Sequence, residues 1–576
     1  MAKTRSSAMF INRHYIKLLA TIATSSLLIL IYITVQAIQN TPIPQSTLLK
    51  LQHELETTIH ASNSVVSDVT IVKCRSFKFC KVPAGYTTIN PSLTFYKYAT
   101  GKSQKKLYEH EYYLALKLSS LDETTRIIAG LSLENHEGYE VIKVNDNEDD
   151  RFFKLYKKYT INNPETPLSR DSPVLRSVDV LFGSNDLIDS RLFHHTLHLS
   201  NEEAVHPILS ISMMSIEQQE EYQKQISQEA KSLVKQDQIL ETSQEKYKVM
   251  QLSDLHFGQD LGRCSRTGGS DAGTATDMKC SSDLKTLKFI ESTIQQEHPD
   301  LIVITGDLID VERSLDYKSI LLKSLQPILA SNTKFIYTFG DEVPSKEDKS
   351  TIVEFLSSLP NCLNTFVPFA DSNLHGVTND NLQIFNKVTR EKDQVDEQTI
   401  SITILDSQDH LIDETQINYL YRINNDFTST DYKLLFFHYP IPQYRPAGTF
   451  KIIGSYNEKH PLDTKTNVKF HDDIINCRYQ VLSVGHEHEN DACILSELAK
   501  KPKKTSRTKE GGDNVPSIWL CYNSITGDSG VTTIHQEYVR KIRLFEVDFE
   551  KRRILSWKRK ENDKDVLEPQ LIYQSK

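Results

Sequence analysis

The chain has 576 residues, a net charge of -9, 38% hydrophobic residues and 25% charged residues, and its mean hydropathy is -0.42. This is the composition of a water-soluble protein with room for two or three domains. The basic clusters are few and local, so we expect no nucleic-acid-binding surface.

One hydrophobic segment, residues 18–38, departs from this soluble character. It carries no charge, and a helix of this length, at about 1.5 Å per residue, can span a bilayer core. Four basic residues precede it and the next charge downstream is Lys50, which predicts a cytosolic tail over residues 1–17 and a chain that continues on the far side. A cleaved signal peptide is the alternative, although the hydrophobic run is longer than usual for one. We therefore expect a single-pass type II protein of the endomembrane system.

The eight cysteines are an even number, and a lumenal or extracellular placement would permit disulfides. Cys74 with Cys80, and Cys264 with Cys280, are close enough in sequence to form bridges. Against this placement, no Asn-x-Ser/Thr glycosylation sequon with a non-proline middle residue occurs in the chain. The side of the membrane therefore stays open at this point.

After the hydrophobic segment, residues 60–215 contain short hydrophobic and aromatic runs broken by polar turns, such as residues 208–211. This pattern predicts a small β-rich domain. Residues 216–246 are rich in Gln, Glu and Lys, with Ile226, Leu233 and Leu240 at heptad-like spacing. We interpret them as a helical connector to the next domain.

From residue 247 onward, short hydrophobic runs alternate with amphipathic segments. The predicted strands are 247–252, 301–305, 334–339, 401–405, 433–437, 479–484, 517–522 and 541–547, and the predicted helices are 283–297 and 316–330. Repeated alternation of strands and helices predicts a layered α/β domain over residues 247–560, with ligands bound at strand ends.

Carboxylate and imidazole side chains follow four of these strands directly. They are Asp254, His256, Asp307, His438, His486 and His488. A single Asp-x-His pair occurs by chance, but neither chance nor packing explains ligand residues after four strands. Imidazole and carboxylate together suit Mn, Fe and Zn. Two such ions about 3.5–4 Å apart need a shared carboxylate, for which Asp307 is the natural candidate.

The motifs Asp254-Leu255-His256, Gly306-Asp307-Leu308-Ile309-Asp310, a lone His438 and Gly485-His486-Glu487-His488 resemble the signature of the calcineurin-like metallophosphoesterase superfamily. The residues around them, 251–258, 436–442 and 485–491, resemble the fungal dosage-dependent cell-cycle regulator phosphatases and the plant purple-acid-phosphatase-like proteins. The resemblance covers residues 245–560. It implies a layered β-sandwich flanked by helices, here preceded by the transmembrane helix and the β-rich domain.

The resemblance also implies which residues bind each of the two metals. One metal would be held by Asp254, His256, Asp307 and His488, and the second by Asp307, His438 and His486. Two cations lower the pKa of bound water and screen phosphate charge, so phosphomonoester hydrolysis is the expected reaction. Asp310 is expected to orient a ligand without binding metal itself. By resemblance to the fungal group, the implied partner is a phosphorylated protein in cell-cycle or stress signalling.

One motif departs from the family. Where the superfamily has Gly-Asn-His-Asp or Gly-Asn-His-Glu, this chain has Gly340-Asp341-Glu342-Val343. Aligned without a gap, Asp341 replaces a metal-binding Asn and Glu342 replaces the His that contacts phosphate and assists the leaving group, a role worth about 10²–10⁴-fold in rate. Aligned with a two-residue deletion, the Asn and His are absent. A metal-binding pseudophosphatase that acts as a membrane-tethered regulator is therefore the alternative to an active phosphatase.

Overall fold

The computed structural model describes most of the chain from residue 64 onward. The described ranges are 64–75, 79–94, 110–121, 126–144, 154–163, 165, 167–184, 186–200, 205–222, 224, 237–258, 281–311, 314, 316–342, 346–364, 374–390, 394–498, 515–528 and 539–575. The predicted tail and membrane segment lie outside these ranges, so the anchor stays a prediction. Within the described ranges, every helix is too short or too polar to cross a membrane.

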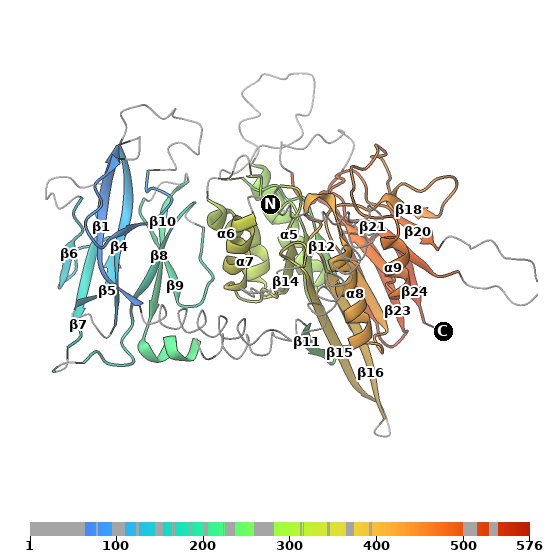
Figure 1. Ribbon diagram of the computed structural model, residues 1–576, viewed down its shortest axis with the longest axis horizontal. Coiled ribbons are helices and arrows are strands. Elements are labelled where there is room, and N and C mark those ends of the chain that lie inside the picture. Colours follow the sequence, from blue (N-terminus) through green and yellow to red (C-terminus); the bar gives the residue numbers. More distant parts are fainter. Residues whose placement is uncertain are drawn as a thin grey trace, which may run out of the picture. The chain divides into compact units, whose positions relative to one another are not determined.

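The first described domain is built from strands, in blue to green in Figure 1. Its strands are β1 (Ser64–Arg75), β2 (Phe79–Cys80), β3 (Thr87–Thr88), β4 (His110–Ser120), β5 (Arg126–Ser132), β6 (Tyr139–Val141), β7 (Tyr156–Ile161), β8 (Val174–Gly183), β9 (His194–His198) and β10 (His206–Met214). They form three sheets, ordered β2-β1-β4-β3, β5-β7-β6 and β8-β10-β9. Hydrophobic residues from all three sheets share one core. These strands fall within the range predicted as β-rich.

The connector differs from its prediction. Residues 216–222 are helical, but β11 (Asp237–Thr242) is a strand that pairs in parallel with β15 (Asp380–Arg390). Leu240, taken in the sequence as part of a helical heptad pattern, instead packs against the core of the following domain. The prediction of a helix through residue 246 is therefore wrong, because pairing with a distant strand outweighs the weak local preference.

The second domain consists of two sheets packed face to face (Figure 1). One has eight strands in the order β11, β15, β16 (Gln394–Ile404), β17 (Tyr432–Phe436), β19 (Val481–Val484), β21 (Ser517–Tyr522), β20 (Cys493–Glu497) and β18 (Ile452–Ile453). The other has six, in the order β14 (Lys334–Thr338), β13 (Leu301–Thr305), β12 (Lys246–Leu252), β22 (Lys541–Asp548), β23 (Arg553–Lys560) and β24 (Leu567–Gln574).

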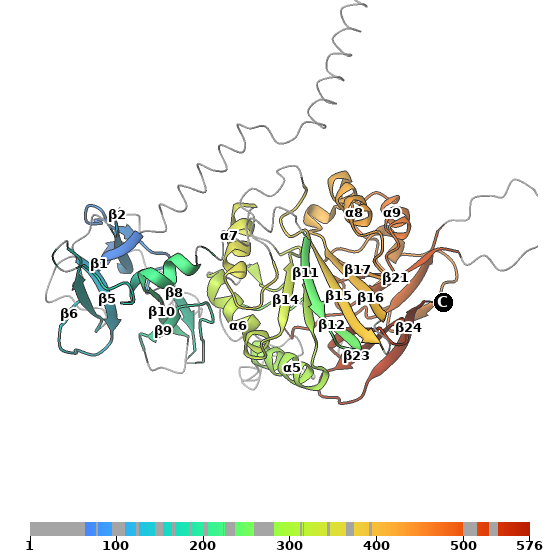
Figure 2. The same ribbon diagram turned by 90° about the horizontal axis from the view of Figure 1, so that it is seen from below.

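Helices cover the outer faces of this sandwich (Figure 2). They are α5 (Ser282–Glu297), α6 (Tyr317–Ala330), α7 (Lys346–Ser357), α8 (Glu414–Asp426) and α9 (Phe470–Asn476). Helices α5, α6 and α7 pack on the six-stranded sheet, and α8 and α9 pack on the eight-stranded sheet. The predicted layered β-sandwich flanked by helices is therefore confirmed for this domain.

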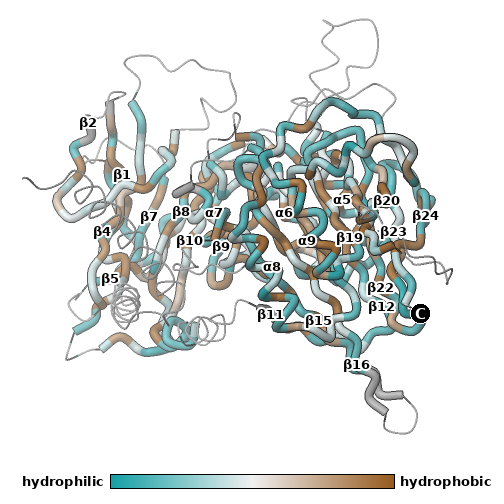
Figure 3. Tube along the Cα trace, turned by 45° about the vertical axis from the view of Figure 1, so that its right-hand side comes forward, coloured by the Kyte–Doolittle hydropathy of each residue, from teal (hydrophilic) through white to brown (hydrophobic). Residues whose placement is uncertain are grey.

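Alternation along the strands explains these layers. In β12, Val249 faces the core between the sheets, whereas its neighbour Met250 faces the helices. Strand β13 is buried at all five positions, as expected for a parallel strand covered on both faces. Figure 3 shows hydrophobic and hydrophilic stretches alternating along this domain.

Two helices begin at residues whose side chains satisfy free backbone N–H groups. The Asp316 carboxylate accepts hydrogen bonds from the backbone N–H groups of Lys318 and Ser319 at the start of α6. Asp413 and Gln416 form a reciprocal capping box at the start of α8. These starts fix where the loops that precede them end, and the loop before α8 contributes to the site described next.

Candidate metal centre

The first half of the site comes from two adjacent parallel strands, β12 and β13. Asp254 and His256 follow β12, and Asp307 follows β13. The loops are tied together, because the His256 backbone N–H donates to the Asp307 carbonyl at 2.9 Å. Adjacent parallel strands end at the same edge of a sheet, so the side chains of Asp254, His256 and Asp307 start from neighbouring positions at that edge.

The second half comes from β14 and from two neighbouring parallel strands of the other sheet, β17 and β19. Asp341 follows β14, His438 follows β17, and His486 and His488 follow β19. The two sheets are joined at this edge by a hydrogen bond from the His486 backbone N–H to Asp254 Oδ1, at 3.2 Å. The site therefore bridges both layers of the sandwich.

The side chains gather into overlapping sets of ligand atoms. Within each set the atoms lie within 4.8 Å of one another, and the sets are Asp254, His256 and His488; Asp341, His438 and His486; and Asp254, Asp307 and His438. Asp254 and His438 each belong to two sets, and the third set, which contains Asp307, links the other two. All seven histidine and aspartate residues predicted for the metals, Asp341 included, are brought together, and their role as ligands stays a prediction.

Backbone strain concentrates at this centre. Asp254, His256, Asp307 and His486 all have positive φ angles, of 55°, 48°, 47° and 68°. Residues other than glycine rarely adopt this conformation, and where they do at functional sites the surrounding structure holds them there. In this backbone conformation, the four side chains come together in the sets of ligand atoms given above.

The residues present fit metal ions. His256 Nε2 is buried and makes no hydrogen bond within the described residues, as expected of an atom reserved for a cation. The Nδ1 atom of His438 lies 2.9 Å from the Thr305 carbonyl, so Nδ1 donates and Nε2 is left to bind metal. Nitrogen and carboxylate donors in one set suit Zn, Fe or Mn.

Carboxylates dominate the electrostatics of the centre. Burial alone would raise the pKa of Asp307 and lower the pKa of His438, but their mutual attraction reverses both shifts. Burial likewise opposes a charge on His256, yet Glu342 and Asp307 outweigh it and raise the pKa of His256 to about 9. The centre therefore attracts positive charge, which metal cations supply when they displace imidazole protons.

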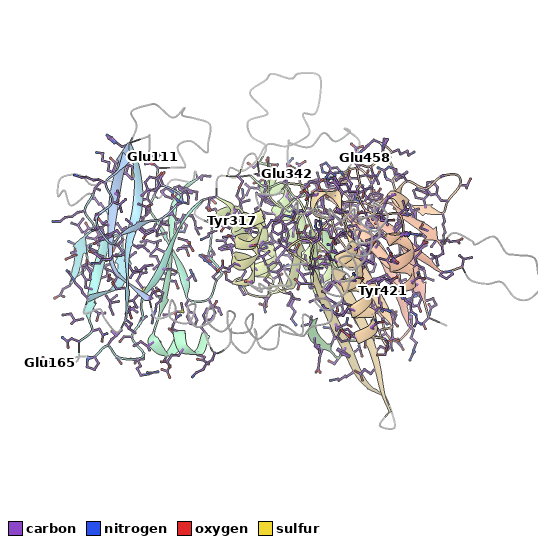
Figure 4. All side chains as sticks on the ribbon, viewed as in Figure 1. Glu111, Glu165, Tyr317, Glu342, Tyr421 and Glu458 are labelled. Atoms are coloured by element: carbon purple, nitrogen blue, oxygen red, sulfur yellow. A yellow bond between two sulfur atoms is a disulfide. The ribbon has the colours of Figure 1, made fainter. Side chains whose placement is uncertain are left out.

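The altered motif lies in the centre, as the alignment without a gap predicts. Asp341 Oδ2 lies 2.7 Å from His486 Nδ1. Gly340 is required beside it, because a Cβ atom there would overlap the Asp307 carboxylate. Glu342 is at the upper edge of the domain in Figure 4, and its Oε1 lies 3.1 Å from His256 Nδ1.

Glu342 and Asp310 both contact the loop that carries His256, and the catalytic role predicted for Glu342 stays a prediction. Glu342 Oε2 accepts a hydrogen bond from the Val311 backbone N–H at 3.0 Å, so its carboxylate is held as an acceptor beside His256. Asp310 is buried next to this loop, and its backbone N–H donates to the Phe257 carbonyl at 2.9 Å. The role of Asp310 as an orienting residue stays a prediction.

Sequence reasoning missed one residue that reaches the centre. His410 lies in the turn η3 (Gln408–His410), and its Nε2 is 3.2 Å from Asp341 Oδ1. The available signal was a polar run, residues 406–410, directly after a predicted strand. Its distance from any recognised motif gave no reason to single it out.

The geometry agrees with comparisons to known proteins. A family model described as calcineurin-like phosphoesterase matches residues 247–490. Protein SIA1 of Kluyveromyces lactis is 28% identical over 571 residues, covering 90% of each chain. Phosphatase DCR2 of Saccharomyces cerevisiae is 27% identical over 349 residues, which are 56% of this chain and 55% of DCR2. The match therefore spans about half of that phosphatase.

A plant relative is named as an inactive phosphatase, unlike the yeast phosphatase. The Arabidopsis thaliana protein "Probable inactive purple acid phosphatase 14" is 25% identical over 345 residues, which are 54% of this chain and 78% of that protein. The relatives thus include proteins named as a phosphatase and as inactive. The family model and these relatives confirm the resemblance seen in the motifs: the chain carries a calcineurin-like phosphoesterase domain over residues 247–490.

Proposed function

We propose that this protein is a two-metal phosphatase that hydrolyses phosphomonoesters, with phosphorylated proteins as its substrates. The observation that carries the proposal is the linkage of the ligand sets through Asp254, Asp307 and His438. Such overlap suits two cations that share a carboxylate. The choice of protein substrates rests on the resemblance to the fungal regulators.

The chain's own residues prepare the reaction in two ways. The imidazoles of His256 and His438 are buried and pre-oriented, so little reorganisation accompanies metal binding. Asp307 is held by the Glu342 backbone N–H at 2.9 Å from its Oδ1 atom, which leaves Oδ2 facing His438. When bound, two metal ions would lower the pKa of water and neutralise charge on the phosphoryl group.

Turnover of an aryl phosphate tests this proposal. The full chain, purified in detergent and loaded with Mn²⁺ or with Fe and Zn, should hydrolyse 4-nitrophenyl phosphate and hold two metals per chain by elemental analysis. The matched control is His438→Ala, which removes a ligand shared by two sets. Two bound metals without hydrolysis of this ester or of phosphopeptides would overturn the phosphatase assignment.

That outcome would favour the second candidate, a metal-binding pseudophosphatase. The observation in its favour is the pair Asp341 and Glu342, which adds two carboxylates to the metal face. An ionised Glu342 repels phosphate where the family has an imidazole. This candidate predicts binding of a phosphopeptide without release of phosphate, which calorimetry and a phosphate-release assay on the same sample distinguish.

We also propose that residues 18–38 anchor the protein and place the described domains in an oxidising compartment. Two observations support the second part. Cys74 is disulfide-bonded, and Cys493 on β20 is bridged to Cys521 on β21. Disulfides persist in secretory compartments and are rare in the cytosol.

Deleting residues 1–40 should move the protein from the membrane pellet to the soluble fraction, because that deletion removes the only long uncharged hydrophobic segment in the sequence. Fractionation of microsomes after carbonate washing checks the anchor, and protease protection with and without detergent checks the side. A truncated chain that stays in the washed pellet would show that another part of the protein holds the membrane.

A further inference from the structure

His410 reaches the metal centre from a loop outside every metal-ligand motif. The turn η3 follows β16, and the His410 side chain is 30% exposed beside Asp341, which is 27% exposed. Of the other residues of that ligand set, His486 is 25% exposed and His438 is fully buried, and the His410 and His486 ring centroids are 6.2 Å apart. His410 therefore lies on the solvent-accessible side of the second ligand set, from which a substrate can reach it.

Two contacts hold the His410 imidazole in place, and a third holds its backbone. Its Nδ1 lies 2.9 Å from the Asp463 carbonyl. Its ring stacks on Tyr439 with centroids 3.7 Å apart and planes inclined by 12°. Its backbone carbonyl accepts a hydrogen bond from the Lys465 N–H at 2.9 Å. A side chain fixed in this way loses little conformational freedom when it contacts a ligand.

The backbone of His410 is itself constrained. Its φ angle is 59°, and the preceding Asp409 has a φ angle of 57°. Two consecutive positive φ angles outside glycine are costly. This strained turn directs the His410 imidazole at Asp341 in the metal centre. The conformational cost is therefore tied to the position of the side chain.

Glu342 leaves a role open that His410 is placed to fill. Glu342 occupies the position at which the family resemblance puts a phosphate-contacting imidazole, but its carboxylate is turned to His256 and the Val311 N–H. Among the described residues, His410 is the imidazole that reaches Asp341 without belonging to a metal-ligand set. It reaches the second ligand set from a different loop, the one that follows β16.

We propose that His410 is a catalytic residue that binds the phosphoryl group of the substrate at the second ligand set, in place of the imidazole absent from position 342. This inference rests on the proposed phosphatase function. The Asp463 carbonyl and the Asp341 carboxylate can only accept hydrogen bonds, so in this arrangement both ring nitrogens of His410 carry a proton: Nδ1 donates to the carbonyl, and Nε2 lies 3.2 Å from Asp341 Oδ1. The Nε2–H of this fixed, positively charged ring can donate to a phosphoryl oxygen bound beside Asp341 and stabilise the charge that the oxygen carries in the transition state.

The test compares His410→Ala and His410→Gln with the parent chain, each as the full protein loaded with the same metal. Elemental analysis should give equal metal content in all three, since His410 belongs to no ligand set. For His410→Ala, kcat/KM for 4-nitrophenyl phosphate should fall roughly 10²-fold. Affinity for inorganic phosphate, measured by calorimetry, should fall about tenfold. His410→Gln, which keeps an N–H donor, should recover part of both losses.

His136→Ala is the matched control. His136 lies in the β-rich domain and belongs to no ligand set; it is 55% exposed, with its Nε2 3.8 Å from Glu134 Oε2, and its replacement should leave phosphate affinity and kcat/KM unchanged. Unchanged phosphate affinity and kcat/KM in His410→Ala, at equal metal content, would overturn the role of His410 and leave the phosphatase assignment intact.

The two proposals fail in distinguishable ways. A parent chain that binds metal and phosphate but does not hydrolyse esters would end the phosphatase assignment, while a tenfold weaker phosphate affinity in His410→Ala would still support the phosphate contact. A parent chain that binds metal but no phosphate would end both.

Discussion

Asp307→Asn should lose most of the metal from both ligand sets and with it the hydrolytic activity. Asp307 belongs to the set that overlaps both outer sets, through Asp254 and His438, and its Oδ2 lies 3.2 Å from His438 Nε2. An amide has no charge to offset two neighbouring cations, so both lose their shared partner. The loss of activity should exceed the 10–100-fold that is typical when a residue that only supports a ligand is replaced.

The Asn side chain nearly preserves the shape of the site. Its Oδ1 can still accept the hydrogen bond from the Glu342 backbone N–H, so the fold should persist and the effect should be confined to metal binding. Circular dichroism of the metal-free variant and parent should therefore coincide. Elemental analysis and 4-nitrophenyl phosphate hydrolysis measure the expected loss.

His488→Ala is the comparison that makes the result specific. His488 belongs only to the set with Asp254 and His256, so its loss should lower the occupancy of one metal and leave much of the other. Equal occupancy of two metals in Asp307→Asn and His488→Ala would show that Asp307 is not the shared ligand.

The positions of the metal-site residues were predictable because they follow buried parallel strands. Residues 301–305 form an unbroken hydrophobic run, and the structure has β13 at those bounds, with Asp307 two residues later. Parallel strands with both faces covered have this signature, and ligands gather at their ends. The same logic located His438 after β17 and His486 after β19.

Strand β15 was missed for a physical reason. It carries buried polar residues where a strand covered on both faces is expected to be hydrophobic: Asn381 and Gln383 are both fully buried. Asn381 Nδ2 donates to Ser401 Oγ at 2.8 Å, and Gln383 Nε2 donates to the same oxygen at 3.1 Å. Both amides depend on the partner strand β16 for hydrogen bonds, so β15 alone does not look like a core strand.

His410 could not be predicted because its position depends on contacts far away in the chain. Its Nδ1 partner is the carbonyl of Asp463, 53 residues later, and its ring partner Tyr439 follows a different strand. No periodicity or local motif encodes a turn that is fixed in this way. Residues that act from loops therefore need the fold before they can be found.

Asp491→Asn should destabilise the layered domain strongly, by about 3–5 kcal/mol, the usual cost of breaking a buried ion pair. Asp491 is fully buried, and its two carboxylate oxygens form ion pairs with Lys541 and Lys558. Its Oδ1 also accepts a hydrogen bond from the Ser455 backbone N–H at 2.9 Å. An amide of the same shape leaves two lysines, on the adjacent strands β22 and β23, without their shared carboxylate.

The pH dependence gives an independent check with a definite sign. Burial opposes the charge of Asp491, but Lys558 and Lys541 outweigh it and lower the pKa of Asp491 from 3.8 to about 2. A lowered pKa stabilises the folded state above pH 3.8, and this contribution is lost as the pH falls from about 4 to about 2. A shift of this size corresponds to roughly 2–3 kcal/mol, which should be missing from the acid unfolding of Asp491→Asn.

Tryptophan fluorescence during urea unfolding, at neutral and at acid pH, measures the stability of the layered domain and its pH dependence. The chain has two tryptophans. Both lie in the layered domain: Trp519 on β21 and Trp557 on β23. Asp563→Asn is the matched control. Asp563 pairs with Lys560 in the exposed turn after β23, where solvent screens the attraction, so its unfolding midpoint should match the parent. If Asp491→Asn also unfolds at the parent's midpoint, the buried cluster contributes no net stability, and the three charges are retained for another purpose, such as holding the loop that carries His486 and His488 against β22 and β23.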